Sequence, residues 1–397
     1  MSRRLAAVAG RWRGVEAVAG WQVAASTCFY AAFAATAAFR ETFGLSRAVV
    51  GLAVTATVFG YTLALFPAGA LVDAYGDRPV MVGGLAGLGL GAVAVGVAAD
   101  ELVLFLALLL VGACYSVGMP ATNRAVVRVA PAGAHGLAVN IKQVGVTAGS
   151  GLGAVLVTGA TTLALGWRAG FLAAGALAVA GAGWYALRAD RSGAGGSGSV
   201  DLPDVGALRA VPGYVSLVAA GFFLGAALFA TTGHVVLHMT EAVAAGPGLA
   251  GLTLAGVQVA GSAGRLGGGW IADRLPGSDA RSAAVVLLGL TLLSVAGFLA
   301  VAFAGSATGA VAGFLVLGVG IVGFPGLYYA CLTAMVPDEQ MGGATAVAQF
   351  VLNVGGLVAP PAAGYAADAA AYRVAWVGLA VAVGLASLLL VVLVWRR

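Results

Sequence analysis

The feature that most constrains this chain is a series of long apolar stretches, separated by short segments that carry most of the charged residues. A helix needs about 20 consecutive apolar residues to cross the hydrocarbon core of a bilayer. Twelve stretches meet this requirement, namely residues 15–39, 48–72, 79–98, 102–122, 136–164, 169–187, 213–237, 248–271, 283–304, 307–336, 342–366 and 374–395. The sequence therefore predicts an all-α membrane protein with twelve transmembrane helices.

Composition excludes the other broad classes. Charged residues make up 9% of the chain and hydrophobic residues 61%, whereas an ordinary soluble domain has about 25% charged residues. The net charge of +5 comes from arginines scattered singly between apolar runs, so no nucleic-acid partner is predicted. Cys28, Cys114 and Cys331 all fall inside apolar stretches. We expect no disulfide framework, no bound metal and no cofactor.

The distribution of arginines predicts the orientation. If both termini are cytoplasmic, fourteen arginines lie in the inside segments and four in the outside segments. Basic residues concentrate on the cytoplasmic side of membrane proteins. We therefore predict a multi-pass protein of the cytoplasmic membrane with both termini inside, and expect it to be a monomer in the lipid bilayer.

Two halves are visible in the sequence. Residues 188–209 include SGAGGSGSVDLPD, whose composition is typical of a flexible linker. This predicts an N-terminal six-helix bundle (residues 1–187), a cytoplasmic linker (188–209) and a C-terminal six-helix bundle (210–397). The motif GALVD of the first half returns as GWIAD 200 positions later, and Gln143 matches Gln349 at an offset of 206. Such duplication is typical of secondary transporters that bind substrate between their halves.

The stretch GALVDAYGDR, residues 69–78, resembles the loop signature of the major facilitator superfamily. The resemblance extends over the twelve helices, the linker and the second-half echo GGGWIADRL. It implies two pseudo-symmetric six-helix bundles that work by alternating access, with a conformational motif in the loop. The residues that match this motif are Gly69, Asp73, Gly76 and Arg78, and in the second half Gly269, Asp273 and Arg274. By resemblance, Gly69 would allow close helix packing and Asp73 would latch the gate, while Asp77 stands where the family usually has a basic residue.

Lys142 is the only lysine of the chain and lies within a predicted helix, as does Arg265. Ionisable residues at membrane depth mark functional sites by default, and no acid falls beside either cation in the predicted spans. The sequence GRLGGGWIAD around Arg265 resembles helix 8 of monocarboxylate and oxalate-formate type carriers, in which an arginine receives the substrate carboxylate. Arg265 can instead brace the cytoplasmic helix end, and Lys142 can instead extend towards the interface.

Polar residues at helical spacing predict the rest of the binding site. The candidates are Gln143, Gln258, Gln349, Asn353 and Tyr30, the last of which can equally pack in the core. His234, His238 and Glu241 share one helix face, for which a metal site, a titrating role of His234 and ordinary interface polarity are the alternatives. We predict no metal and name His234 as the candidate for proton coupling.

These observations predict a secondary active transporter that moves a small organic anion, a carboxylate, by alternating access. The first alternative is a multidrug or metabolite exporter of the same superfamily. The second is a membrane receptor or scaffold that transports nothing. No set of nucleophile, base and orienting residue is present in the sequence, so we do not expect an enzyme.

Overall fold

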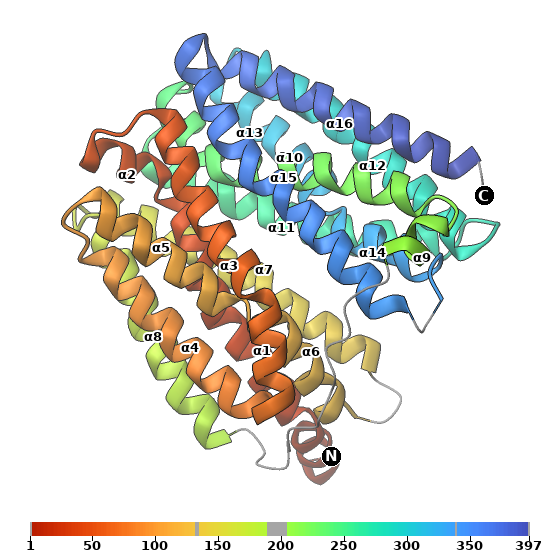
Figure 1. Cartoon of the computed structure of the whole chain (residues 1–397). Helices are drawn as coiled ribbons and strands as arrows, with labels where there is room; N and C mark the ends of the chain where they lie inside the picture. Colours follow the sequence, from red (N-terminus) through yellow and green to blue (C-terminus); the bar gives the residue numbers. More distant parts are fainter. Residues whose placement is uncertain (1, 132–134, 189–204, 338–339, 396–397) are drawn as a thin grey trace. The chain divides into compact units, whose positions relative to one another are not determined.

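The computed structural model describes residues 2–131, 135–188, 205–337 and 340–395, and all elements within these ranges are helical (Figure 1). In chain order they are α1 (Ser2–Ala34), α2 (Thr36–Phe43), α3 (Arg47–Tyr75), α4 (Asp77–Gly96), α5 (Glu101–Tyr115), α6 (Gly118–Val129), α7 (His135–Thr162), α8 (Trp167–Arg188), α9 (Val205–Ala210), α10 (Tyr214–Glu241), α11 (Pro247–Ala272), α12 (Asp279–Ala302), α13 (Ala307–Leu317), the π-helix η1 (Gly318–Val322), α14 (Pro325–Thr333), α15 (Met341–Ala369) and α16 (Tyr372–Trp395). The prediction of an all-α protein is confirmed.

Most of these helices can cross a membrane. Ten described spans are long and apolar enough, with α5 and α6 counted as one span and α13, η1 and α14 as another. The pair α1 and α2, which is bent by 51° at its junction, gives an eleventh span. The glycine-rich α11 is outside this set but is 26 residues long, which at 1.5 Å per residue exceeds the hydrocarbon thickness. Each of the twelve predicted stretches thus coincides with one helix or with a broken helix.

Two compact units make up the chain, and each has its own packing. One unit comprises Met1–Ala35 and Ala56–Val200, and the other comprises Thr36–Thr55 and Asp201–Arg397. The segment Thr36–Thr55, which holds α2 and the start of α3, thus packs with the C-terminal half of the sequence. Residues 189–204 of the predicted linker, 188–209, lie outside the described residues, and the short helix α9 follows them.

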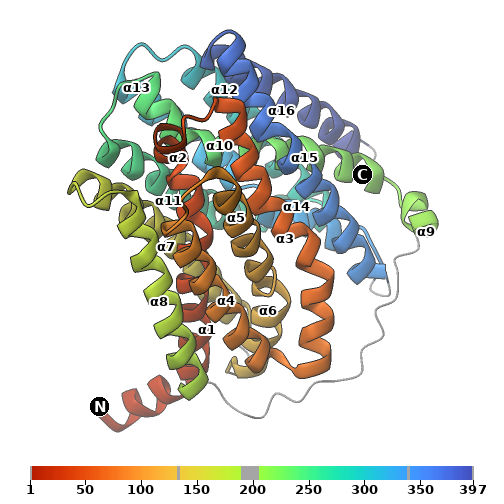
Figure 2. The ribbon, with the colours of Figure 1, turned by 60° about the vertical axis from the view of Figure 1, so that its left-hand side comes forward.

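Helices of the first unit approach one another through glycines. A β-carbon on Gly145, Gly149 or Gly153 of α7 would lie 2.3–2.8 Å from a backbone oxygen of α1. In the same way α4 and α8, which lie side by side in Figures 1 and 2, meet at Gly89 and Gly175. Because lipid gives helices no hydrophobic incentive to associate, such close backbone contact supplies much of the packing energy.

The second unit uses the same device between α10 and α15. Gly225 of α10 contacts the backbone oxygen of Leu352, and Gly355 of α15 contacts the backbone oxygen of Phe222, each closely enough to exclude a β-carbon. α12 packs beside α16 in this unit. The glycines therefore fix the distance between the helices that carry the polar residues described below.

The fourth and tenth predicted spans are both broken near their middle. The fourth breaks between Tyr115 and Gly118, where the Ser116 Oγ donates to the carbonyl of Ala113 at 2.7 Å. The tenth contains the π-helix η1 and then Pro325, the first residue of α14. Proline lacks the backbone N–H of a normal helical residue, and π-turns occur frequently at functional sites. The break in the fourth span also places the Ser116 Oγ 3.2 Å from the carbonyl of Ala64 in α3.

Candidate functional site

Lys142 is completely buried, as its place within an apolar stretch suggests. Its side chain has 0% exposure, and its Nζ donates to the Asn123 Oδ1 at 2.6 Å. Asn123 belongs to α6 and Lys142 to the first turns of α7. No described carboxylate lies within ion-pair distance of this ammonium. The alternative prediction, that Lys142 extends towards the membrane interface, does not hold in this structure, because its side chain has no exposed surface.

A polar network lies next to this pair in the first unit. The Gln22 Nε2 donates to the Ser26 Oγ at 3.2 Å and to the Tyr115 Oη at 3.4 Å, and these two hydroxyl oxygens are 3.1 Å apart. The Thr122 Oγ1 donates to the Gln22 Oε1 at 3.5 Å. Since Thr122 precedes Asn123 on α6, the network includes the residue next to the hydrogen-bond partner of Lys142. Gln22, Ser26 and Asn123 were not among the residues that sequence reasoning selected.

Aromatic rings extend the same region. Phe29 stacks on Tyr115 with ring centroids 4.1 Å apart, and it also contacts Tyr30, Phe33 and Tyr61. Tyr30 is therefore part of an aromatic cluster in the first unit. Gln143, the residue after Lys142, is half-buried on α7. The cluster gives this side of the site flat apolar surfaces beside hydrogen-bonding groups.

The second unit has its own polar cluster on α14 and α15. The Tyr329 Oη donates to the Gln349 Oε1, and the Gln349 Nε2 donates to the Asn353 Oδ1 at 2.8 Å. Asn353 is fully buried and its Nδ2 has no hydrogen-bond partner within the described structure. A buried donor left unpaired costs about 1–3 kcal/mol. The predicted residues Gln349 and Asn353 are thus brought together, and Asn353 retains an unused donor.

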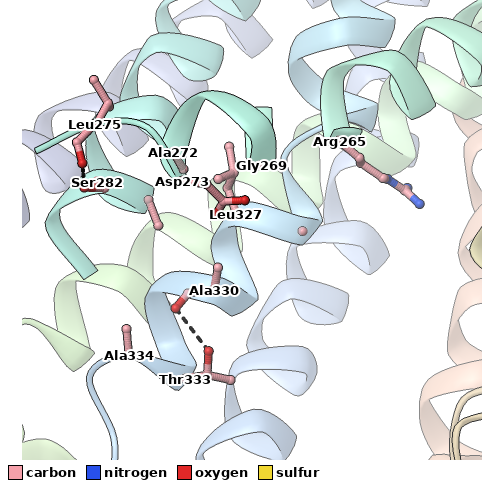
Figure 3. A pocket seen from close by; sticks show the side chains of 12 residues that line it. Arg265, Gly269, Ala272, Asp273, Leu275, Ser282, Leu327, Ala330, Thr333 and Ala334 are labelled. Carbon is pink, nitrogen blue, oxygen red and sulfur yellow. Dashed lines mark hydrogen bonds between the residues drawn. The ribbon is translucent and has the colours of Figure 1, made fainter. Parts of the chain in front are cut away.

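Arg265 lies on α11, seven residues after the buried Gln258. Its Nε donates to the carbonyl of Val322 in η1 at 3.1 Å. Arg265 lines a cavity of about 560 Å³ between α11, α12 and α14, and in Figure 3 its guanidinium points away from the other labelled residues of that cavity. Bracing of the broken helix is therefore one role of Arg265. Lys142 and Arg265 belong to different units, so their pairing stays a prediction.

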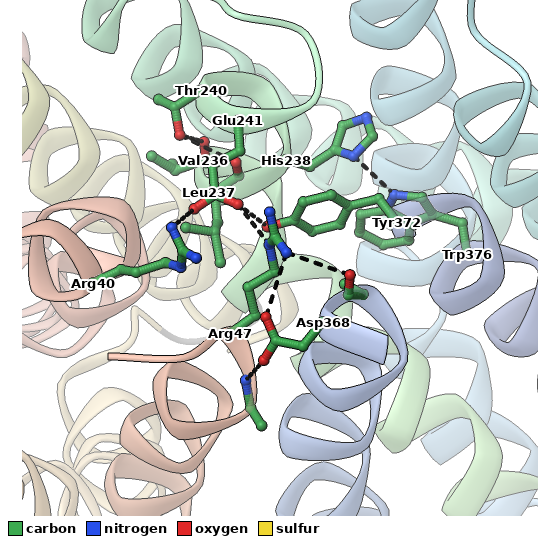
Figure 4. A network of polar contacts seen from close by, with 12 residues as sticks. Arg40, Arg47, Val236, Leu237, His238, Thr240, Glu241, Asp368, Tyr372 and Trp376 are labelled. Atoms are coloured by element: carbon green, nitrogen blue, oxygen red, sulfur yellow. Dashed lines mark hydrogen bonds and ion pairs between the residues drawn. The ribbon is translucent and has the colours of Figure 1, made fainter. Parts of the chain in front are cut away.

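Two arginines and two acids form a charge cluster in the second unit (Figure 4). The Glu241 carboxylate receives the Arg40 Nη1 at 2.8 Å and the Arg47 Nε at 2.6 Å, while the Arg47 Nη1 lies 3.4 Å from the Asp368 Oδ1. The Tyr372 Oη also donates to Glu241 at 3.1 Å. The cluster is neutral and ties the segment Thr36–Thr55 to α10 and α15. Neither arginine is among the candidate site residues predicted from the sequence.

The face of α10 that carries two histidines ends at this cluster. The His234 Nδ1 donates to the carbonyl of Ala230 at 3.0 Å, and its buried Nε2 has no described partner. The Trp376 Nε1 donates to the His238 Nδ1 at 3.1 Å. The Glu241 carboxylate forms ion pairs with Arg40 and Arg47. Among the residues that the structure describes, no group of three or more His, Cys, Asp or Glu side chains is placed to hold a metal ion.

The sequence matches one known protein family over most of its length. The sequence profile of the Major Facilitator Superfamily matches residues 19–360 and 238–397. The chain belongs to this superfamily. No curated protein sequence matches it.

Solved structures agree with the superfamily fold. A crystal structure of a bacterial homolog of the human lysosomal transporter Spinster, in an inward-facing and occupied conformation, has a TM-score of 0.80 at 16% identity and covers 96% of either chain. The inward-facing and unoccupied conformation of that homolog has a TM-score of 0.79 at 17% identity and covers 97% of either chain. The predicted major facilitator fold is confirmed, and the protein is a membrane transporter rather than an enzyme.

The superfamily loop between α3 and α4 is held by two ion pairs. The Arg128 Nη2 lies 2.9 and 2.7 Å from the two oxygens of Asp77, whose side chain is 1% exposed. The Arg124 Nη1 lies 3.4 Å from the Asp73 Oδ1. The acid at position 77, where the resemblance predicts a base, therefore has a cation as its partner on α6.

The remaining motif residues have separate roles. Gly76 has φ +82° and begins the turn into α4, a conformation that glycine adopts without strain. The Arg78 Nη2 donates to the carbonyl of Ala186. A β-carbon on Gly69 or Gly269 would meet no described atom within 4 Å, so the close packing expected at Gly69 is absent from this conformation. In the second half, Asp273 caps α11, and Arg274 stacks on Trp270 at 3.8 Å.

Proposed function

We propose that this superfamily transporter moves a small organic anion, a carboxylate, by alternating access. The observation that carries the proposal is the fully buried Lys142, whose acceptor is the neutral amide of Asn123. A buried ammonium without a counter-charge is destabilising by several kcal/mol. An ammonium has three N–H donors, so a carboxylate that reaches Lys142 would supply both the missing charge and further acceptors.

The acids of the described chain support an anionic substrate by their positions. Asp77 and Asp73 pair with arginines of α6, and Glu241 and Asp368 pair with Arg47. A carrier of organic cations is expected to keep a carboxylate available in its binding cavity. These four carboxylates are instead held in ion pairs within the protein, whereas the buried Lys142 has a neutral partner.

We further propose that Arg265 joins Lys142 as the second cationic group of the site. Its planar fork suits a carboxylate, and its Nε contact with Val322 would hold the side chain in one orientation. The amides of Gln143, Gln258, Gln349 and Asn353 and the hydroxyl of Tyr30 are proposed to complete the lining. The buried Nδ2 of Asn353 supports this assignment, because it is a donor in need of an acceptor.

Counterflow in proteoliposomes tests this function. A panel of mono- and dicarboxylates would be compared for wild type, Lys142→Gln and Arg265→Gln, with Arg373→Gln as the matched control because Arg373 is an exposed cation stacked on Phe303. We expect loss of about 1.4 kcal/mol or more of binding, tenfold or greater in affinity, in the first two variants alone. Unchanged carboxylate counterflow in both would overturn the anion site.

A second candidate function is export of apolar or aromatic compounds. It is favoured by the cluster of Phe29, Tyr30, Phe33, Tyr61 and Tyr115, whose flat faces suit ring-containing ligands. Efflux of lipophilic dyes that is lost in Phe29→Ala and retained in the lysine variant would favour this function over the first.

Orientation, domain division and coupling are part of the proposal. Both termini are proposed to be cytoplasmic, with two six-helix bundles joined by a cytoplasmic linker. His234 is proposed to carry a coupled proton, since its Nε2 is buried and unpaired within the described residues. If it does, His234→Gln will retain counterflow but lose acceleration of uptake by an imposed pH gradient. Unchanged gradient dependence would rule this role out.

A further inference from the structure

Asp73 of the first half and its counterpart Asp273 of the second half differ in their ion-pair partners. In the first half, Asp73 at the end of α3 and Asp77 at the start of α4 pair with Arg124 and Arg128 of α6. The second half repeats this corner with α11, α12 and α14, and Asp273 follows Asp73 by 200 positions. The described second half has no arginine on α14 that corresponds to Arg124 or Arg128.

The register of the repeat shows what replaces the arginines. The offset between halves is 205 at the proline shared by the broken helices (325 − 120) and 206 at the glutamine shared by the next helices (349 − 143). With either offset, no cation falls on the corresponding face of α14. The counterparts of Arg124 are Tyr329 or Ala330, and those of Arg128 are Thr333 or Ala334.

A cavity occupies the place of the missing side chains. It has a volume of about 560 Å³, and its lining includes Asp273, Ala330, Thr333 and Ala334 (Figure 3). This volume lies within the range of small-molecule pockets. The Ser282 and Thr333 hydroxyls on its wall donate to backbone carbonyls. The cavity therefore resembles the space left when arginines are truncated to small residues.

The electrostatics of the cavity favour a cation. The C-terminal end of α14 lies at its wall with no basic residue in its last turn, whereas α6 ends with Arg128. The C-terminal end of α11 also lies there, and its Trp270 carbonyl accepts a hydrogen bond from the Arg274 Nη1 at 3.0 Å. Helix C-termini carry negative partial charge. The N-terminus of α12 has the opposite sign but is capped by the Ser278 side chain. Arg265 also lines the cavity, and its guanidinium points away from the other labelled residues in Figure 3. The exposed Asp273 has no ion-pair partner among the described residues.

We propose that this cavity is a binding site for a small cation with an aliphatic stem and a guanidinium or primary ammonium head. The head replaces the arginine heads of the first half and pairs with Asp273. The stem fills the space between the alanines of α14 and the small residues of α11. The site lies within one unit and shares only Arg265 with the proposed anion site. The guanidinium of Arg265 points away from the other labelled residues of the cavity, so either assignment can fail alone.

Calorimetric titration of n-butylguanidinium into the purified transporter in nanodiscs tests the site, with sodium chloride at equal ionic strength as the blank. Asp273→Asn removes the carboxylate, and Thr333→Arg restores an internal guanidinium and fills the space. Lys142→Gln is the control for the anion site. We expect saturable binding to wild type and Lys142→Gln, weakened about tenfold or more in Asp273→Asn and lost in Thr333→Arg.

Two outcomes would overturn the proposal. One is no heat beyond the sodium chloride blank in wild type. The other is equal affinity in wild type, Asp273→Asn and Thr333→Arg, which would place the ligand elsewhere. Size-exclusion profiles and circular dichroism of every variant show whether it is folded, so that a lost binding signal can be attributed to loss of the site. A variant that misfolds is replaced by Ala334→Arg, which fills the same wall.

Discussion

The ion pair between Asp77 and Arg128 predicts a strongly asymmetric response to mutation. The Asp77 side chain is 1% exposed and the Arg128 side chain is 27% exposed. Arg128→Ala therefore leaves a carboxylate that cannot reach water, and removing one partner of a buried pair costs about 3–5 kcal/mol. Asp77→Asn leaves an arginine that can extend towards solvent, so it should lose only the charge-assisted hydrogen bonds, about 1.5–3 kcal/mol.

The double variant sharpens this prediction. Asp77→Asn combined with Arg128→Ala removes both charges, so it should be more stable than Arg128→Ala alone. The resulting coupling energy should be roughly 1.5–3 kcal/mol, within the range for residues in direct contact. The pair of Asp73 and Arg124 is the internal control, because it is 3.4 Å long and about two-fifths exposed. Its disruption should cost about 0–1 kcal/mol.

Equilibrium unfolding in mixed micelles, titrated with dodecyl sulfate and followed by tryptophan fluorescence, measures these differences. The reasoning is refuted if the double variant loses as much stability, relative to wild type, as the two single variants lose in sum, because the coupling energy would then be zero. It is also refuted if Arg128→Ala costs no more than disruption of the exposed pair, because burial of Asp77 is the origin of the asymmetry.

Three further predictions follow from packing and charge. Gly149→Ala places a β-carbon 2.3 Å from a backbone oxygen of α1 and should lower stability by about 1–3 kcal/mol in the same unfolding titration, whereas Gly159→Ala, with open space around it, should be neutral or slightly stabilising. Glu241→Gln should speed amide hydrogen exchange about tenfold or more in the segment that carries its two arginines, measured by mass spectrometry, and unchanged exchange would contradict its role in holding that segment. Asn123→Asp supplies Lys142 with an internal counter-charge, so it should raise stability while lowering carboxylate counterflow at least about tenfold, and undiminished counterflow would count against the anion site.

Hydropathy alone predicted the helices because the bilayer admits few other structures. A spanning segment must satisfy its own backbone hydrogen bonds, so each long apolar run had to become a helix. The breaks were less accessible. Pro120 and Pro325 lie inside predicted spans, yet the π-helix between Gly318 and Val322 depends on contacts with neighbouring helices as well as on local sequence. Hydropathy also does not indicate with which half a short segment packs. Thr36–Thr55 precedes most of the first half in sequence but packs with the second.

The candidate site was predictable where a residue was anomalous in its own helix. Lys142 is conspicuous as a lone lysine in an apolar run, and Gln22 offered a similar signal that sequence reasoning passed over. Partners were harder to predict. Asn123 reaches Lys142 from another helix, and Arg47 meets Glu241 from 194 positions away. Helical periodicity assigns a face to a residue but not the neighbour which that face meets.

The charges of the described structure explain why substrate and conformational change would be linked. Asp77 and Glu241 are balanced within the protein by arginines, so their electrostatic free energy is set by the protein alone. Within the described residues Lys142 is hydrogen-bonded to the neutral amide of Asn123 and has no ion pair, so its electrostatic free energy depends on what enters the site. If a closed state excludes water from Lys142, an anion stabilises that state more than it stabilises an open, hydrated one. Exchange between conformations should then be faster with bound carboxylate than without it, which favours coupled exchange over leak.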